Sequence, residues 1–107
     1  MFFLLLDRKF FLTYNVTMKI SQILWDEESV YHIAKHGISP REVEEAIFEG
    51  SPLVLKGRDG KYIVLSRSLS GRYLIIIAAF KLKGRVKVIT ARDMDEKERK
   101  YYQRRGK

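Results

Sequence analysis

The stretch KHGISP, residues 35–40, decides the fold, because it ends one predicted helix and begins the next. Gly37 stands where the C-terminus of a helix commonly takes a left-handed backbone conformation. Ser39, Pro40 and Glu42 have the spacing of a capping box with proline at the first helical position. The sequence therefore predicts a tight corner between two short helices.

Apolar residues follow a helical period on both sides of this corner. Asp26 is a suitable N-cap for a first helix of about three turns that ends at Gly37. The second helix is predicted over residues 40–49 and ends at Gly50. A short strand over residues 19–25 precedes both helices.

Beyond Pro52 the apolar pattern changes to that of strands. Turn residues separate the strands, so each strand is expected to pair with the next in an antiparallel meander. The third strand is apolar at every position, as expected for a central strand that is covered on both faces. The predicted strands are residues 53–56, 62–67, 73–80 and 85–92.

A final helix is predicted after the last strand. Asp93 is followed three residues later by Glu96, which is the pattern of an N-cap. The order is then strand, two helices, four-stranded antiparallel meander and helix, which is an α+β fold. A chain of 107 residues supports one domain.

The N-terminal residues do not fit this pattern. Residues 2–6, FFLLL, are too few to span a membrane, and no small-residue cleavage site follows them, so we predict neither a membrane span nor a signal peptide. Met18 precedes the first stretch with a clear pattern. We therefore expect residues 1–17 to be an N-terminal extension and residues 18–107 to be the single domain. The alternative is an added edge strand.

The net charge of +8 is unevenly distributed along the chain. Residues 1–52 hold 5 Lys and Arg against 8 Asp and Glu, whereas residues 53–107 hold 16 against 5, so the net charges are −3 and +11. A positive field of this size attracts polyanions such as nucleic acid. The alternative is a solvated, lysine-rich surface. The absence of cysteine excludes disulfides and agrees with a cytoplasmic location.

Two arginines are the best candidates for a phosphate site. Arg67 ends the second strand of the meander and Arg92 ends the fourth. These strands run in the same direction, so both side chains are expected at one end of the sheet. Guanidinium groups match the paired oxygens of a phosphate. The alternative is that both form structural ion pairs with Asp26, Glu27 or Asp93 at helix N-termini.

His36, at the corner, has the side chain best suited to proton transfer near neutral pH, and Lys35 is beside it. The alternative is a structural contact between His36 and the last carbonyl groups of its helix. His32 lies four residues earlier on the same helix face, but no further His or Cys completes a set of metal ligands. We therefore predict no metal and no other cofactor.

The motifs of several common chemistries are absent: no Walker loop, serine-nucleophile elbow or dinucleotide fingerprint is found. RNA cleavage needs none of them, because the neighbouring 2′-hydroxyl can be the nucleophile. The protein must then move two protons and neutralise the charge of the phosphorane. One histidine or lysine, two arginines and a tyrosine would be sufficient. Trp25 or a tyrosine of the last helix would be able to stack on a base, although either is more often a core residue.

The order and spacing of several motifs resemble the BrnT-type toxins of bacterial and archaeal toxin–antitoxin pairs. The likeness covers residues 20–102; position 90 is Thr where the family often has Ser, and residues 1–17 have no counterpart. The resemblance implies a RelE-like ribonuclease fold and RNA cleavage that arrests translation. It also implies neutralisation, in a hetero-oligomer, by a ribbon-helix-helix (BrnA-like) antitoxin that represses the shared operon. The motifs are WDEE at 25–28, KHGIS at 35–39, a hairpin ending at Arg67, ITAR at 89–92, then Glu98, Arg99 and Tyr101.

By analogy with the wider fold, the resemblance implies roles for particular residues. We predict that His36 or Lys35 moves protons, that the two strand-end arginines hold the scissile phosphate, and that Tyr101 orients the RNA or stacks on it. The predicted catalytic residues are Lys35, His36, Arg67, Arg92 and Tyr101, and the predicted RNA-binding residues are Trp25, Arg72, Arg99 and Lys100.

The first prediction for the function is thus a metal-independent endoribonuclease toxin. The alternative is a basic module that binds RNA or DNA without cutting it, or a degenerate toxin that serves only as an antitoxin partner. Salt-sensitive binding of an uncleaved ligand would distinguish that alternative. A third reading is a small interaction protein whose positive face binds an acidic partner.

Overall fold

The computed structural model describes residues 15–16 and 19–105, and these form one mixed sheet with three α-helices. The predicted α+β class is confirmed. A 3₁₀ turn, Leu82–Gly84, lies between β5 and β6. The other elements, in chain order, are β1 (Asn15–Val16), β2 (Gln22–Leu24), α1 (Glu27–Ala34), α2 (Pro40–Phe48), β3 (Leu53–Lys56), β4 (Lys61–Arg67), β5 (Tyr73–Phe80), β6 (Arg85–Asp93) and α3 (Glu96–Arg105).

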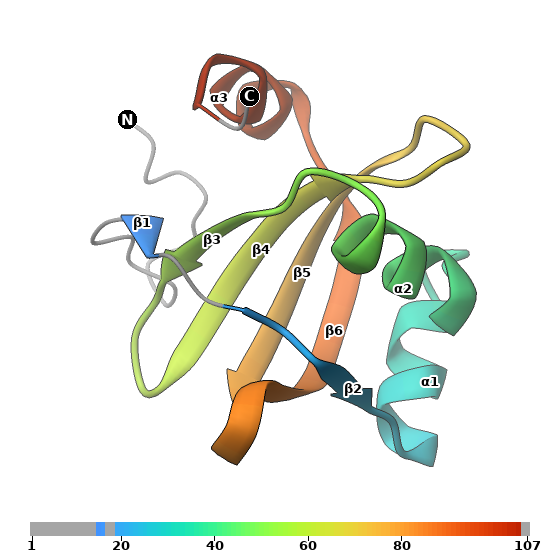
Figure 1. Cartoon of the computed structure of the whole chain (residues 1–107). Helices are drawn as coiled ribbons and strands as arrows, with labels where there is room; N and C mark the ends of the chain where they lie inside the picture. Colours follow the sequence, from blue (N-terminus) through green and yellow to red (C-terminus); the bar gives the residue numbers. More distant parts are fainter. Residues whose placement is uncertain (1–14, 17–18, 106–107) are drawn as a thin grey trace.

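The strands lie in the order β1-β3-β4-β5-β6-β2 across the sheet (Figure 1). β3, β4, β5 and β6 are consecutive antiparallel neighbours. β2 pairs with β6 in parallel at one edge, and β1 pairs with β3 at the other. β2 is shorter than the strand predicted over residues 19–25. Of the predicted N-terminal extension, residues 1–14 and 17 lie outside the described residues.

The sheet has a hydrophobic cluster on each face, because alternate strand residues point to opposite sides. On one face, called here the α1/α2 face, Ile33 and Val43 of the two helices pack with Leu74 and Ile76 of β5. On the other, called the α3 face, Tyr102 packs with strand residues at the end where β4 and β6 terminate. The central strand β5 is therefore covered on both faces, as predicted.

The corner between α1 and α2 forms mostly as predicted. Asp26 caps α1, and Gly37 has the left-handed conformation, with φ of 71°. Ser39 Oγ accepts a hydrogen bond from the backbone N–H of Glu42 at 3.2 Å. The predicted capping box is only half formed, because the Glu42 carboxylate binds Arg72 instead of the N-cap backbone. α1 is also shorter than predicted, since its eight residues make about two turns.

The N-cap predicted for the last helix was wrong. Asp93 still belongs to β6, where it pairs with Leu74 of β5, and α3 begins only at Glu96. Asp95 caps the helix instead: its Oδ1 accepts from the N–H of Glu98 at 2.8 Å, and Glu98 Oε1 accepts from the N–H of Asp95 at 2.9 Å. Strand pairing thus carries β6 one residue further than expected and shifts the start of α3.

None of the helices in the described part of the chain is both long enough and apolar enough to span a bilayer.

Candidate active-site cavity

Arg67 and Arg92 lie on the same face and at the same end of the sheet. Arg67 stands opposite Tyr73 on β5, and Arg92 stands opposite Ile75. Tyr73 and Ile75 are two positions apart on one strand, so they share a face, and both belong to the cluster of the α3 face. The structure therefore places both arginines at one end of the sheet, as the strand directions predicted, and on the α3 face, opposite the face that carries the corner between α1 and α2.

Arg92 nevertheless has a carboxylate partner. Its Nη1 and Nη2 donate to the two oxygens of Glu98 at 2.9 and 2.8 Å, and Nη1 also donates to the Asp93 carbonyl at 3.0 Å. The Glu98 side chain is fully buried, whereas that of Arg92 is 43% exposed. This paired, fork-like contact is a structural ion pair near a helix N-terminus, but its partner is Glu98 and not the Asp26, Glu27 or Asp93 that the sequence offered as alternatives.

Arg67 is exposed and only weakly held. Its Nε donates to the carbonyl of Gly71 at 3.3 Å, and its Cζ lies 4.9 Å from the centre of the Tyr73 ring. Arg99 of α3 approaches the same ring, with its Cζ at 5.5 Å. Two guanidinium groups from distant parts of the chain therefore meet at Tyr73. Gln103 Nε2 donates to the Tyr73 hydroxyl at 3.1 Å, which leaves the tyrosine proton available to another acceptor.

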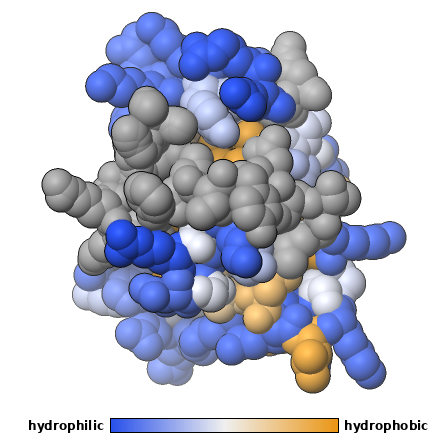
Figure 2. All heavy atoms as spheres, turned by 90° about the vertical axis from the view of Figure 1, so that its left-hand side faces the viewer, coloured by the Kyte–Doolittle hydropathy of each residue, from blue (hydrophilic) through white to orange (hydrophobic). Residues whose placement is uncertain are grey.

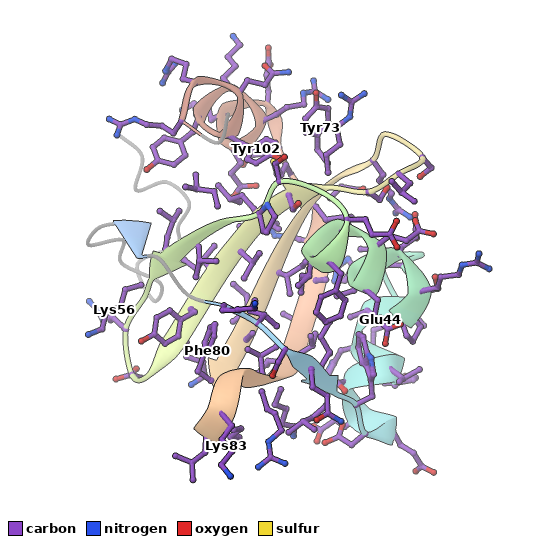
Figure 3. All side chains as sticks on the ribbon, in the orientation of Figure 1. Glu44, Lys56, Tyr73, Phe80, Lys83 and Tyr102 are labelled. Atoms are coloured by element: carbon purple, nitrogen blue, oxygen red, sulfur yellow. The ribbon has the colours of Figure 1, made fainter. Side chains whose placement is uncertain are left out.

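A cavity of about 640 Å³ opens beside this group, between the α2–β3 loop, the β4–β5 turn and α3. Figure 3 shows Tyr73 and Tyr102 close together at this end of the molecule. Tyr102 donates to the Ser51 carbonyl at 2.8 Å, and burial raises the pKa of its hydroxyl. Tyr102 is therefore protonated at neutral pH and acts as a hydrogen-bond donor. The cavity lining includes Ser51, Arg67, Ser68, Ser70, Tyr73 and Tyr102.

The backbone at Gly50 closes one side of the cavity. A Cβ atom built there would lie 2.5 Å from the Arg67 carbonyl oxygen, 2.6 Å from that of Ala46 and 2.7 Å from Ser66 Oγ. Ser66 is itself buried and donates to the Ala46 carbonyl at 2.7 Å. The end of α2 is therefore pressed against β4 where only glycine fits.

Lys35 and His36 lie on the α1/α2 face, and the structure does not bring them to the cavity, which opens on the α3 face. Arg72 holds this corner: it donates to the carbonyls of His36 and Gly37 at 3.0 and 2.8 Å and binds the carboxylate of Asp93 at 2.7 Å. Asp93 follows Arg92 on β6, so its side chain points to the α1/α2 face.

The same contacts govern the ionisation of the corner. The hydrogen bond from Arg72 lowers the pKa of Asp93, and the nearby charge of His36 acts in the same direction. The partnership with Asp93 in turn raises the pKa of Arg72. Since Glu42 also binds this guanidinium at 3.0 Å, Arg72 is engaged by four protein groups.

The other predicted residues lie around the cavity and the corner, without forming a group of their own. Trp25 packs partly buried against the α1/α2 cluster, and its Nε1 donates to Glu44 at 3.0 Å. Tyr101 packs against the α3-face cluster. Lys100 is exposed and pairs with Glu96 at 3.5 Å. Of the predicted set, the cavity region therefore gathers Arg67 and Arg99, with Arg92 and Tyr101 close by on the same face.

Sequence reasoning did not single out Tyr73, Tyr102 or Gln103. Tyr73 was read only as the start of the apolar strand, and the two α3 residues lie in a helix whose apolar pattern is weak. Their hydrogen bonds join residues 30 and 51 positions apart, which no local pattern indicates.

Within residues 15–16 and 19–105, no group of three or more His, Cys, Asp or Glu residues is arranged to hold a metal ion.

Comparison with known proteins places the chain in one family. Residues 25–98, which run from the end of β2 to the first turn of α3, match the model of the BrnT ribonuclease toxins of type II toxin–antitoxin systems. No curated protein and no solved structure matches the chain. The family match covers more than half of the 107 residues. The chain therefore belongs to the BrnT family, the ribonuclease toxins of type II toxin–antitoxin systems.

Proposed function

We propose that this toxin cleaves RNA without a metal ion and thereby arrests translation, using the cavity on the α3 face as its active site. The observation that carries the proposal is the meeting of Arg67 and Arg99 at Tyr73, beside a cavity of about 640 Å³. Two exposed cations near a hollow suit an anionic substrate. Figure 2 supports this choice, since the side chains over α3, at the top of that view, are hydrophilic.

The reaction is an internal transfer at phosphorus. The ribose 2′-oxygen attacks the adjacent phosphorus and loses its proton, while the bond from phosphorus to the 5′-oxygen breaks and that oxygen gains a proton. The products are a 2′,3′-cyclic phosphate and a 5′-hydroxyl. Negative charge grows on the non-bridging oxygens, so the guanidiniums of Arg67 and Arg99 stabilise the phosphorane. The Tyr73 hydroxyl accepts a hydrogen bond from Gln103, so its O–H is free to donate a hydrogen bond to the phosphate.

We predict that the residues at the corner between α1 and α2, Lys35 and His36, transfer the protons. Lys35 and His36 are exposed next to Arg72, on the far side of the β4–β5 turn from Arg67. RNA lying across this turn would contact both places, and the proposed proton transfer requires the scissile phosphate to lie at the turn, between Arg67 and the corner. Arg72 is engaged by four protein groups, so we propose that it holds the corner rather than the RNA. Lys100 and Tyr101 would contact RNA outside the cavity, and Trp25 remains a predicted stacking residue.

The remaining expectations complete the proposal. The arrangement of helices on both faces of an antiparallel meander supports a RelE-like layout. The partner is a ribbon-helix-helix antitoxin, and the place of action is the cytoplasm, where RNA and antitoxin are available. The net charge of +11 over residues 53–107 favours partners with acidic surfaces.

Induction and cleavage assays test the proposal. The chain is expressed under tight control, and the purified protein is incubated with total RNA, with and without ribosomes, in excess EDTA. We expect growth arrest and RNA fragments that end in 2′,3′-cyclic phosphate. Intact RNA in every condition, with salt-sensitive RNA binding, would instead favour a binding module without catalysis. Cleavage that EDTA abolishes would contradict the metal-independent mechanism.

A further inference from the structure

We infer that Arg92 is a positioning residue, which holds α3 over the cavity through Glu98 and does not itself contact the RNA. The inference deepens the proposed function and rests on it for the activity measurement alone. It gives a different role to a side chain that the resemblance placed at the scissile phosphate.

The first argument is the burial of Glu98. Its carboxylate is fully buried and receives three hydrogen bonds: two from Arg92, at 2.9 and 2.8 Å, and one from the N–H of Asp95 at 2.9 Å. A buried carboxylate without a cation is strongly unfavourable. Glu98 occupies the fork that Nη1 and Nη2 of Arg92 form, and Nη1 also donates to the Asp93 carbonyl, so binding a phosphate with this fork would leave Glu98 uncompensated. The pair is therefore maintained while RNA is bound.

The second argument is the composition of α3. Within its ten residues, only Glu98 and Tyr102 are buried, and most of the others are charged. Such a helix has little apolar surface with which to dock on the sheet. The contact between Arg92 and Glu98 thus fixes the first turn of the helix, and Tyr102 fixes the next turn by its bond to Ser51.

The third argument is the place of Arg99. It directly follows Glu98, and its guanidinium lies 5.5 Å from the Tyr73 ring beside Arg67. Anchoring Glu98 therefore sets where Arg99 lies. Arg92 acts on the reaction through this helix, from a β6 position whose neighbour Asp93 binds the corner on the opposite face.

A double-mutant comparison separates positioning from direct contact. Arg92→Gln leaves Glu98 buried without a cation, so we expect amide hydrogen exchange in α3 to accelerate about 100-fold and RNA cleavage to fall by a similar factor. Arg92→Gln combined with Glu98→Gln replaces the ion pair by a neutral amide pair. This double variant should regain protection in α3 and cleave RNA within about tenfold of the parent.

Three results would overturn the inference. The first is a double variant whose α3 is protected but whose cleavage is as low as that of Arg92→Gln, because a lost phosphate contact cannot be rescued at Glu98. The second is unchanged exchange in α3 when Arg92 alone is replaced. The third is a double variant in which α3 remains unprotected. If Arg92→Gln does not fold, the comparison of exchange in α3 and of RNA cleavage between the double variant and the parent still tests the inference.

Hydrogen exchange is measured without RNA, so it is independent of the proposed function. If the parent protein cuts no RNA, the proposed function fails, while the exchange rates of α3 still decide whether Arg92 anchors the helix. Lys100→Gln, which removes an exposed cation of the same helix, is the control and should leave exchange in α3 within about threefold of the parent.

Discussion

Replacing Arg67 by alanine is expected to remove far more activity than stability. Its contacts within the protein are a long hydrogen bond to Gly71, at 3.3 Å, and the approach to Tyr73, at 4.9 Å. Each is worth about 1 kcal/mol or less at an exposed site, so the free energy of unfolding should fall by at most about 2 kcal/mol. Loss of a group that stabilises the transition state costs about 100- to 1000-fold in rate, or about 3–4 kcal/mol.

Arg85→Ala is a matched control. Arg85 is exposed at the opposite end of the sheet, and its Nε donates to the Leu82 carbonyl at the same distance of 3.3 Å. Initial rates on one defined RNA and urea unfolding curves are measured for both variants. Arg85→Ala should keep its rate within about threefold of the parent. An Arg67→Ala protein with the parent's rate would refute the phosphate role. If the loss of transition-state free energy, calculated from the rates, equals the loss of unfolding free energy, Arg67 acts only on the fold.

Three further predictions concern the corner and the N-terminus of α1 that precedes it. Arg72→Ala should lower the free energy of unfolding by about 2 kcal/mol, because the removed guanidinium binds two partly exposed carboxylates and two carbonyls. A change below about 0.5 kcal/mol in the unfolding free energy measured in urea would contradict this. His36→Ala should reduce RNA cleavage by about 100-fold if this side chain transfers protons, and an unchanged rate would remove it from the catalytic set. The bond from Lys87, with those from Ser29, lowers the pKa of Asp26 from 3.8 to about 2, so its stabilising effect is complete above pH 3.8 and is lost as the pH falls to about 2. Asp26→Asn should therefore flatten the pH dependence of unfolding in that range, and an unaltered profile would show that another group is responsible.

The strands and the corner were predictable because their signals are local. Alternation of apolar residues defines β6, in which Val86 and Val88 are buried while Arg85 is exposed. Caps and a left-handed glycine define the corner, since each needs only residues three or four positions apart. The order of elements and the α+β class followed from these local patterns.

The start of α3 shows where local signals are insufficient. Asp93 with Glu96 and Asp95 with Glu98 are two identical capping patterns only two residues apart. Pairing of Asp93 with Leu74 in the sheet decides between them. That pairing depends on where β5 ends, which no pattern near Asp93 records.

The candidate site was predicted only in part, because the partners of charged residues are set by tertiary contacts. The strand directions correctly brought Arg67 and Arg92 to one end of the sheet. Whether each was available to a ligand depended on its partners: Glu98 occupies Arg92, whereas Arg67 has, among the described residues, only a long hydrogen bond to the Gly71 carbonyl and the Tyr73 ring beside it. The approach of Arg99 to Tyr73 joins residues 26 positions apart and has no periodic signature.

The close packing at Gly50 has a consequence for how substrate preference can change among related toxins. Three oxygen atoms lie within 2.7 Å of the position that a side chain would occupy there, so any substitution at Gly50 would force the backbone of this wall to shift. A nucleotide must accommodate itself to that wall. Diversity in the sequences that are cut is then expected to arise from the opposite rim, at the exposed end of the β4–β5 turn that carries Ser70, whereas the buried Ser68 holds the turn by accepting a hydrogen bond from the Arg72 N–H.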